Sequence, residues 1–251
     1  MILNLMFGKA ENMKKLVSAI LICMIMICNL TGCTTDKINS SSNKTTIYFV
    51  RHGQTDTNVE GLMVGQSGDP QLTEDGKNNA FKLGKGLSKI KFDAAYSSDL
   101  TRAYDTAELV LKGANESLKV EKESNFNDIS WGDAEGMSWE EISKKYNVAD
   151  MSQCFGNIDD KKFKSPINAE SKYEFCKRFD NGIKKVLDEN PPGANILIVA
   201  HSSLAFYLQK IFPESDISGI DNTSVTIVKY DYDNKEFELK DLNDTGYLGQ
   251  N

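Results

Sequence analysis

The sequence predicts an α/β protein, a three-layer α/β/α sandwich with a mostly parallel central sheet. Two observations favour this fold class. Apolar runs of strand length alternate along the chain with segments whose apolar residues recur at helical spacing, which is typical of a parallel sheet covered by helices. The run at 196–200 is apolar without interruption, as a strand buried on both faces would be. A single domain over 46–251 is long enough to form such a sandwich.

Local signals predict where these elements begin and end. Thr73 and the acidic residues after it favour a helix start, because a threonine side chain caps free N–H groups and acids suit the positive end of the helix dipole. The Pro-Pro-Gly sequence at 191–193 ends another helix before the apolar run. The elements expected in chain order are a strand at 46–51, a helix at 73–90, a strand at 94–98, a helix at 100–113, a strand at 118–123, helices at 138–146 and 169–189, a strand at 195–200, a helix at 203–212, and strands at 223–231 and 235–240.

The N-terminal segment carries the features of an export signal. Lys14 and Lys15 precede an uncharged apolar run at 16–28, which is shorter than the roughly 20 residues that a membrane span needs. The Leu-Thr-Gly-Cys sequence that ends at Cys33 resembles the lipobox of bacterial lipoproteins. This resemblance implies that residues 1–32 are a signal peptide, that Cys33 becomes lipid-modified, and that the protein is exported and anchored to the outer face of the bacterial cell membrane.

Two alternatives stay open for this segment. The same apolar run could serve as an uncleaved signal anchor, and translation could start at Met1 or at Met13. Residues 34–45 are polar and rich in serine, which predicts a flexible linker between the anchor and the domain.

Charge and cysteine content exclude several classes of protein. The formal net charge is −7, and it becomes −9 when residues 1–32, with three lysines and one glutamate, are left out. No basic face for nucleic acid is therefore expected. Cys154 and Cys176 remain beyond the lipobox, and their spacing is compatible with one disulfide or with two free thiols. Two histidines and two distant cysteines do not make a metal-ligand cluster, so we expect neither a metal nor another cofactor.

Both histidines of the chain directly follow predicted strands. His52 follows the strand at 46–51, and His201 follows the strand at 195–200. The carboxyl ends of parallel strands are where α/β sheets bind ligands. A neutral imidazole can attack phosphorus through one ring nitrogen when an acceptor holds the proton of the other. Gly53 is expected to allow a sharp turn that exposes the ring of His52.

Three motifs lie around the two histidines and between them: Arg51-His52-Gly53-Gln54-Thr55 with Asn58 after it, a Ser-x-Leu-x-Arg-Ala-x-x-Thr-Ala pattern that contains Arg102, and Val199-Ala200-His201. Together they resemble the motifs of the histidine phosphatase superfamily, which has the phosphoglycerate mutase-like fold. The resemblance implies that His52 is the nucleophile, which forms a phosphohistidine, and that His201 stabilises the charge on the transferring phosphoryl group. The phosphate-binding residues that it implies are Arg51, Thr55, Asn58 and Arg102.

The same resemblance points to Asp128, in Asn127-Asp128-Ile129, as the proton donor. Most relatives have glutamate at this place. A free aspartate titrates at about 3.9 and a free glutamate at about 4.3, so a protonated Asp128 at neutral pH would need a raised pKa, or else the activity optimum would lie on the acid side. Asp133 and Glu135 are rival donors, although either could instead cap the helix that starts near 138. Ser202 stands where relatives usually have glycine, and we expect activity to survive this change.

The sequence favours a phosphatase over a mutase. In the superfamily that the chain resembles, phosphoglycerate mutases carry a longer insertion between the acid and the second histidine. Extra basic residues in this insertion bind the substrate carboxylate. The corresponding segment, 147–168, is short and has no arginine, and its three lysines are Lys161, Lys162 and Lys164. We therefore predict a metal-independent phosphomonoester hydrolase that acts on a phosphorylated small molecule. Mutase-type phosphoryl transfer and a non-catalytic anion-binding surface lipoprotein are the alternatives. The loops at 59–70 and 137–168 are expected to cover the pocket.

Overall fold

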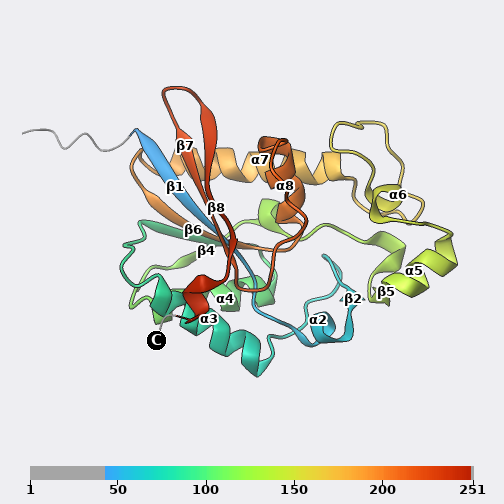
Figure 1. Ribbon diagram of the computed structural model, residues 1–251, viewed down its shortest axis with the longest axis horizontal. Helices are drawn as coiled ribbons and strands as arrows, with labels where there is room; N and C mark the ends of the chain where they lie inside the picture. The colour runs from blue at the N-terminus through green and yellow to red at the C-terminus, as the bar shows by residue number, and fades with distance from the viewer. Residues whose placement is uncertain (1–42, 250–251) are drawn as a thin grey trace, which may run out of the picture. The chain divides into compact units, whose positions relative to one another are not determined.

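A six-stranded sheet forms the centre of the structure, a computed structural model that describes residues 43–249 (Figure 1). Across the sheet, the strands are β4 (Val120–Lys122), β3 (Ala94–Ser97), β6 (Asn195–Ala200), β1 (Lys44–Arg51), β7 (Val225–Asp231) and β8 (Glu236–Asp244). The first four are parallel to one another, while β7 is antiparallel to β1, and β8 is antiparallel to β7. The prediction of a mostly parallel central sheet is therefore confirmed.

Helices cover both faces of this sheet. They are α3 (Glu74–Gly86) and α4 (Thr101–Gly113) on one face, and α7 (Lys172–Glu189) and α8 (Leu204–Ile211) on the other (Figure 1). Successive side chains of the central strands enter two separate hydrophobic cores. Ile47 of β1 belongs to the core with α7 and α8, and its neighbour Tyr48 belongs to the core with α3 and α4. The predicted three-layer sandwich is confirmed, and burial on both faces explains why its central strands are apolar throughout.

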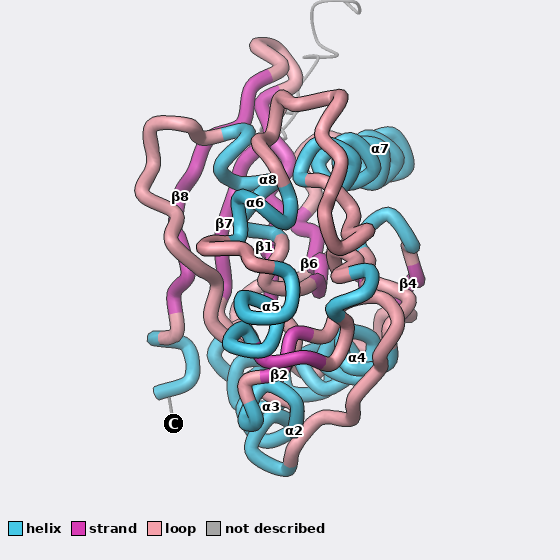
Figure 2. Tube along the Cα trace, turned by 90° about the vertical axis from the view of Figure 1, so that its right-hand side faces the viewer, coloured by secondary structure: helices cyan, strands magenta, loops and turns pink. Residues whose placement is uncertain are grey.

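Short elements surround the carboxyl end of β1. They are α2 (Asp56–Glu60), β2 (Leu62–Met63), β5 (Met137–Ser138), α5 (Trp139–Tyr146) and α6 (Met151–Phe155). Figure 2 shows α2, β2, α5 and α6 on the side that faces the viewer, and β2 pairs with β5 as a separate antiparallel sheet. Only α5 was predicted, because elements of two or five residues are too short to show a period. Three short 3-10 turns complete the described chain: η1 (Ser124–Phe126), η2 (Gly132–Ala134) and η3 (Gly246–Gly249).

Most boundaries differ from the predicted ones by one to four residues; α3, for example, already ends at Gly86, and β8 continues to Asp244. The starts of β1 and α7 differ for local reasons. β1 begins at Lys44, so the end of the predicted linker at 34–45 belongs to the sheet, where Lys44 forms an ion pair with the end of β7 at 3.0 Å. α7 begins at Lys172, later than predicted, because Ser171 and Glu174 form a capping box there. The expected helix start at Thr73 is confirmed, since its side chain accepts a hydrogen bond from a backbone N–H in the first turn of α3.

Several predictions concern residues beyond the described part of the chain. The signal peptide at 1–32, the lipid-modified Cys33 and most of the linker lie outside the described residues. Within 43–249, no helix is both long and apolar enough to cross a membrane. Cys154 and Cys176 are buried free thiols, which decides between the two possibilities that their spacing left open. Burial raises the pKa of the Cys176 thiol to about 12, so this thiol stays protonated at neutral pH.

Candidate active site

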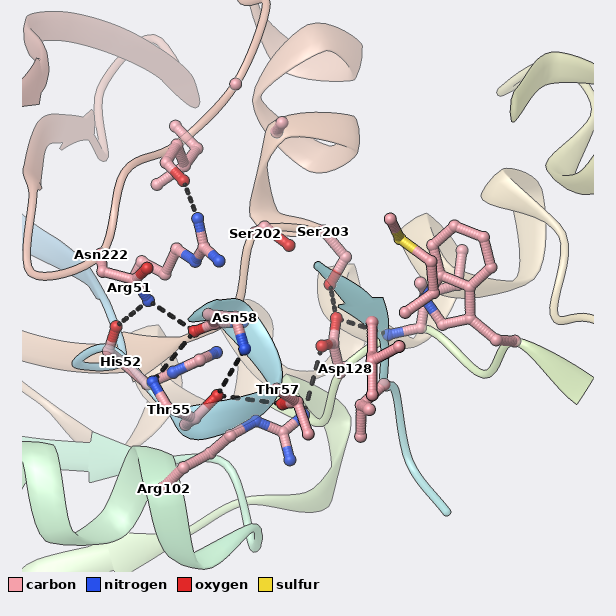
Figure 3. A pocket seen from close by; sticks show the side chains of 18 of the residues that line it. Arg51, His52, Thr55, Thr57, Asn58, Arg102, Asp128, Ser202, Ser203 and Asn222 are labelled. Atoms are coloured by element: carbon pink, nitrogen blue, oxygen red, sulfur yellow. Dashed lines mark hydrogen bonds and ion pairs between the residues drawn. The ribbon is translucent and has the colours of Figure 1, made fainter. Parts of the chain in front are cut away.

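The carboxyl ends of β1 and β6 meet at a cavity of about 550 Å³. Parallel pairing of the two strands brings the residues that follow them together, as predicted. Of the seven residues that the sequence analysis assigned to the phosphate and its chemistry, six line this cavity, and they are Arg51, His52, Thr55, Asn58, Arg102 and Asp128 (Figure 3). The seventh, His201, is buried beside His52.

The imidazole of His52 is buried, and its Nδ1 lies 2.8 Å from the carbonyl oxygen of Gly53. A carbonyl oxygen can only accept a hydrogen bond, so Nδ1 carries the proton and Nε2 keeps its lone pair. Burial is the main reason why the pKa of His52 lies well below its ordinary value of 6.5, and the nearby His201 ring and the charges of the two arginines also disfavour a protonated His52. The ring is therefore neutral, with one nitrogen held as a donor and the other able to attack an electrophile.

His201 packs against this ring, with the two ring centroids 5.1 Å apart. Burial, together with the charges of Arg102 and Arg51, also holds its pKa well below the ordinary value. Neither ring nitrogen of His201, nor Nε of Arg51, has a hydrogen-bond partner within the described structure. Buried polar atoms are normally paired, and an anionic oxygen is an acceptor that such N–H groups can satisfy.

Two guanidinium groups reach the cavity from different elements. Arg102, in the first turn of α4, is buried and donates to the carbonyl oxygens of Gly68 at 2.9 Å and Gly65 at 3.0 Å. Arg51, at the end of β1, donates to the carbonyl oxygen of Ile220 at 2.7 Å. Two of these bonds fix the plane of the Arg102 group, and one orients the Arg51 group. Two fixed cations at one end of a cavity can bind and orient a phosphate.

Thr55 and Asn58 both belong to the start of α2. Thr55 is the N-cap of this helix, and its Oγ1 accepts a hydrogen bond from the backbone N–H of Asn58 at 3.3 Å. The side-chain oxygen of Asn58 accepts in turn from the backbone N–H of Thr55 at 3.2 Å and from Asn222 at 3.1 Å. Because this oxygen is engaged, the NH₂ group of Asn58 is the part that can donate to an anion, as the sequence analysis expects.

Asp128 is buried, and both of its carboxyl oxygens have partners. Oδ1 accepts from the hydroxyl of Ser203 at 2.6 Å and from the backbone N–H of Ile129 at 2.9 Å. Oδ2 lies 3.3 Å from Nη2 of Arg102 and 3.6 Å from Nδ1 of His201. The carboxyl group is thus held in one orientation at the centre of the site.

The two rival acids have structural roles. Asp133 accepts a hydrogen bond from a side-chain amide in the loop before α7, at 2.7 Å. Glu135 accepts from the backbone N–H groups of Gly65 at 2.7 Å and Trp131 at 3.0 Å, so it joins two loops. Neither is among the described residues that line the cavity. The idea that one of them caps α5 is wrong, because Ser138 is the N-cap of that helix.

Three residues that the sequence analysis did not single out organise the site. Ser203 donates to Asp128, Asn222 donates to the carbonyl oxygen of His52 at 2.9 Å, and Arg178 of α7 donates to the carbonyl oxygen of Asp128 at 2.7 Å. Their partners are 50 to 170 positions away in the sequence. No local spacing could have revealed them, since only the fold brings the partners together. Within 43–249, the site included, no group of three or more His, Cys, Asp or Glu is placed to hold a metal ion.

The reason for Gly53 differs from the expected one. Gly53 is not among the glycines with positive φ, so no left-handed turn requires it. A Cβ at Gly53 would instead lie 2.7 Å from the carbonyl oxygen of Gly76, and a Cβ at Gly76 would lie 2.3 Å from that of Gln54. The two glycines therefore allow the start of α3 to approach the loop after β1 closely.

Proteins of similar sequence include both mutases and phosphatases. Residues 47–245 match the model of the histidine phosphatase superfamily (branch 1). A 2,3-bisphosphoglycerate-dependent phosphoglycerate mutase of Cytophaga hutchinsonii is 30% identical over 80% of this chain and 92% of its own length. A broad-specificity phosphatase of Saccharomyces cerevisiae is also 30% identical, over 84% of this chain and 90% of its own length.

Solved structures agree with this pattern. A phosphoglycerate mutase from Bacillus anthracis superposes with a TM-score of 0.72 at 28% identity, and the match covers 84% of this chain and 98% of that one. A mycobacterial glucosyl-3-phosphoglycerate phosphatase superposes with a TM-score of 0.67 at 25% identity, over 80% of this chain and 99% of that one. The chain belongs to the histidine phosphatase superfamily, whose members transfer phosphoryl groups through a histidine as phosphatases or as mutases.

Proposed function

We propose that this protein is a phosphomonoester hydrolase in which His52 carries the phosphoryl group as a phosphohistidine and Asp128 is the proton donor. The orientation of His52 carries the proposal. Its Nδ1 donates to the carbonyl oxygen of Gly53 at 2.8 Å, so Nε2 is the nucleophilic nitrogen in a cavity that Arg51 and Arg102 also line. A neutral ring held in this way can attack without first losing a proton.

In the first step, Nε2 of His52 attacks phosphorus, and the bond between phosphorus and the alcohol oxygen breaks. The proton of the Asp128 carboxyl passes to the departing oxygen, so a neutral alcohol leaves. Arg51 and Arg102 bind the non-bridging oxygens, and His201 donates its one N–H to the charge that develops on them. The products are the phosphohistidine, the alcohol and the Asp128 carboxylate.

In the second step, a water molecule takes the place of the alcohol. The Asp128 carboxylate removes a proton from this water as its oxygen attacks phosphorus, and the bond between phosphorus and His52 breaks. Inorganic phosphate is released, and both His52 and Asp128 return to their starting protonation states.

The cations around the cavity favour hydrolysis over a mutase reaction. A phosphoglycerate carries a carboxylate besides its phosphate, and this second anion needs a cation of its own. Among the described residues, Arg51 and Arg102 are the only basic side chains that line the cavity. Lys161, Lys162 and Lys164 do not line it, so these lysines offer no site for the carboxylate.

The third alternative, a non-catalytic anion-binding lipoprotein, is less consistent with the site. An anion-binding module needs the two arginines but has no use for a neutral histidine with a free lone pair. It also has no use for a buried carboxyl group, because Asp128 would repel a bound anion unless it carried a proton.

Leaving-group dependence tests the assignment of Asp128. Nitrophenolate leaves without a proton, whereas an alkoxide needs one, so Asp128→Asn should lower kcat/KM for ethyl phosphate by about 10²–10⁴-fold and for p-nitrophenyl phosphate by about tenfold at most. Asp133→Asn is the matched control, and it should leave both values close to those of the wild type. Equal losses on the two esters in Asp128→Asn, or the leaving-group effect in Asp133→Asn, would argue against this donor. All assays contain EDTA, because the proposed reaction needs no metal ion. Turnover that persists in His52→Ala would exclude a phosphohistidine at this residue.

We also propose, from the lipobox-like sequence, that Cys33 is lipid-modified and that the protein is anchored to the outer face of the cell membrane. Bacteria that express the full chain and grow with an alkyne-labelled fatty acid should produce labelled protein. Cys33→Ser should abolish the label, while Cys154→Ser, which changes a buried thiol, should retain it. Label that survives in Cys33→Ser, or an unlabelled wild type, would contradict the anchor.

A further inference from the structure

The wall of the cavity beyond Asp128 is apolar. It is formed by side chains from β2, from the loop after Asp128, from α6 and from α8, and the largest are Met63, Ile129, Trp131, Met151, Phe155 and Phe206. In Figure 3, the labelled polar groups around His52 lie on one side of Asp128, and largely carbon side chains lie on the other. The cavity therefore has a polar end, which holds the nucleophile, and an apolar end.

Aromatic contacts fix this wall. The rings of Trp131 and Phe155 meet edge to face with centroids 4.7 Å apart, and Phe206 lies 6.0 Å from Phe155. Phe155 is fully buried in the larger hydrophobic core, so the wall is continuous with the packed interior. A wall built in this way keeps its shape when a ligand arrives.

The apolar surface continues to the mouth of the cavity. In 43–249, two large hydrophobic side chains are exposed, Val59 with 65% and Met151 with 41% of their surface. Met151 lines the cavity, whereas Val59, on the neighbouring helix α2, does not. Met151 therefore extends the apolar wall to the solvent-exposed edge of the cavity.

The charges of the lining exclude a second anion at this end. The basic side chains among the described lining residues, Arg51 and Arg102, belong to the polar end, and the acidic ones are Asp128 and Asp221. The cavity volume of about 550 Å³ falls in the range of sites that hold a drug-sized ligand, so it has room for more than a phosphate.

We propose that the apolar wall is the leaving-group subsite, and that the substrates are phosphate monoesters of uncharged, apolar alcohols with an alkyl or aryl group. The proposal rests on the proposed function, because it assumes that the phosphate occupies the end of the cavity with His52. Asp128 lies between the two ends of the cavity, beside the place that the bridging oxygen of such an ester would occupy. The alcohol then leaves across the apolar wall.

A chain-length series tests the subsite. The purified full-length protein is assayed with ethyl, butyl and hexyl phosphate below their micelle concentrations, and with 3-phosphoglycerate. Burial of each methylene should raise kcat/KM by up to about fourfold, mainly through a lower KM, and all three alkyl esters should be better substrates than 3-phosphoglycerate.

Two matched variants locate the effect. Met151→Gln should lower kcat/KM for hexyl phosphate at least about threefold more than for ethyl phosphate, because the longer chain reaches the mouth. Val59→Gln also replaces an apolar side chain by a polar one, but at a more exposed site outside the lining. Both esters should be hydrolysed by this variant as by the wild type.

The possible results separate the two proposals. Hydrolysis that does not depend on chain length, a preference for 3-phosphoglycerate, or equal effects of Met151→Gln and Val59→Gln would overturn the subsite and leave the phosphatase intact. Failure to hydrolyse any ester, p-nitrophenyl phosphate included, would overturn the proposed function itself.

Discussion

At the scale of single residues, the site depends on two histidines that are buried and neutral. Burial lowers the pKa of both His52 and His201 well below 6.5, and the surrounding arginines act in the same direction. In the proposed mechanism, a neutral His52 can attack phosphorus over a wide pH range. A neutral His201 has a single N–H to donate, and Asp128 is 3.6 Å from its Nδ1.

Both rings should therefore stay neutral well below the pH at which a free histidine becomes charged. Because the chain has two histidines in all, ring-¹⁵N NMR of the untagged protein gives two sets of signals, which His52→Gln and His201→Gln assign. Between pH 7.5 and 5.5 the ring shifts should remain those of the neutral form. A titration centred near 6.5 at either residue would show that the ring is not held neutral.

Ser203 should act as a positioning residue for Asp128, the proposed proton donor. Its hydroxyl donates to Oδ1 of Asp128 at 2.6 Å, and Ser203→Ala removes this bond without touching the reacting atoms. We expect kcat/KM for ethyl phosphate to fall by about tenfold, which corresponds to about 1.4 kcal/mol, while the value for p-nitrophenyl phosphate changes much less. Ser203→Thr, which keeps the hydroxyl, should recover part of the loss. A purely structural role would instead lower both values equally.

At the scale of secondary-structure elements, close contacts between backbones determine how the helices are placed. A Cβ at Gly84 of α3 would lie 2.1 Å from the carbonyl oxygen of Val110, and a Cβ at Gly113 of α4 would lie 2.2 Å from that of Phe81. The two helices therefore touch through glycines. Arg102, in the first turn of α4, depends on this packing for its place beside the cavity.

Gly84→Ala should destabilise the protein by about 1–3 kcal/mol, because α3 must move away from α4 to make room. This is the opposite of the helix propensity, which favours alanine over glycine by about 1 kcal/mol. Urea unfolding measures the difference. Gly219→Ala is the control, since a Cβ there meets open space, and its effect should stay within about 0.5 kcal/mol. An increase in stability for Gly84→Ala would mean that the helices are not in close contact.

Long elements could be predicted from the sequence, and short ones could not. The strand at 195–200 has the predicted bounds because its apolar run is unbroken, whereas α6, with five residues, shows no period. The same limit applies to the site. Arg51, His52 and Arg102 stand in local motifs, but Asn222 contacts His52 only through a fold that joins positions 170 apart. The role of Gly53 was misread for the same reason, since its close neighbour is Gly76 of α3.

At the scale of the whole molecule, the strand order brings the site together. β6 lies between β1 and β3, so the residues that follow these three strands meet at one edge of the sheet. The sequence predicts a parallel sheet with histidines at its strand ends, but it does not predict which strands are neighbours. The two histidines form one site because their strands lie side by side in the sheet.

The buried histidines also make the stability of the whole molecule depend on pH. In the unfolded chain both should titrate near 6.5, while in the folded protein their pKa values are far lower. Below about pH 6.5 the unfolded state therefore binds more protons, and the free energy of unfolding decreases as the pH falls. Each histidine contributes a slope of up to about 1.4 kcal/mol per pH unit, and this contribution to stability is fully present above pH 7.

Urea unfolding between pH 7 and pH 5 should show this slope. Carboxylates contribute in the same direction, but they are present in every variant, so differences in slope isolate the histidines. His52→Gln and His201→Gln should each reduce the slope, and the double variant should reduce it most. If the free energy of unfolding depends on pH equally in the wild type and the double variant, the pKa values of the two histidines are not lowered in the folded protein.

Trapping the phosphorylated enzyme tests the central claim most directly. The untagged protein is mixed with ³²P-labelled p-nitrophenyl phosphate and quenched in alkali within milliseconds, because phosphohistidine is stable to base and labile to acid. Peptide mapping by mass spectrometry then locates the label. We predict one acid-labile phosphoryl group on His52, absent in His52→Ala and still formed in Asp128→Asn. Label on His201, or steady turnover with no phosphorylated enzyme at any time, would contradict the account.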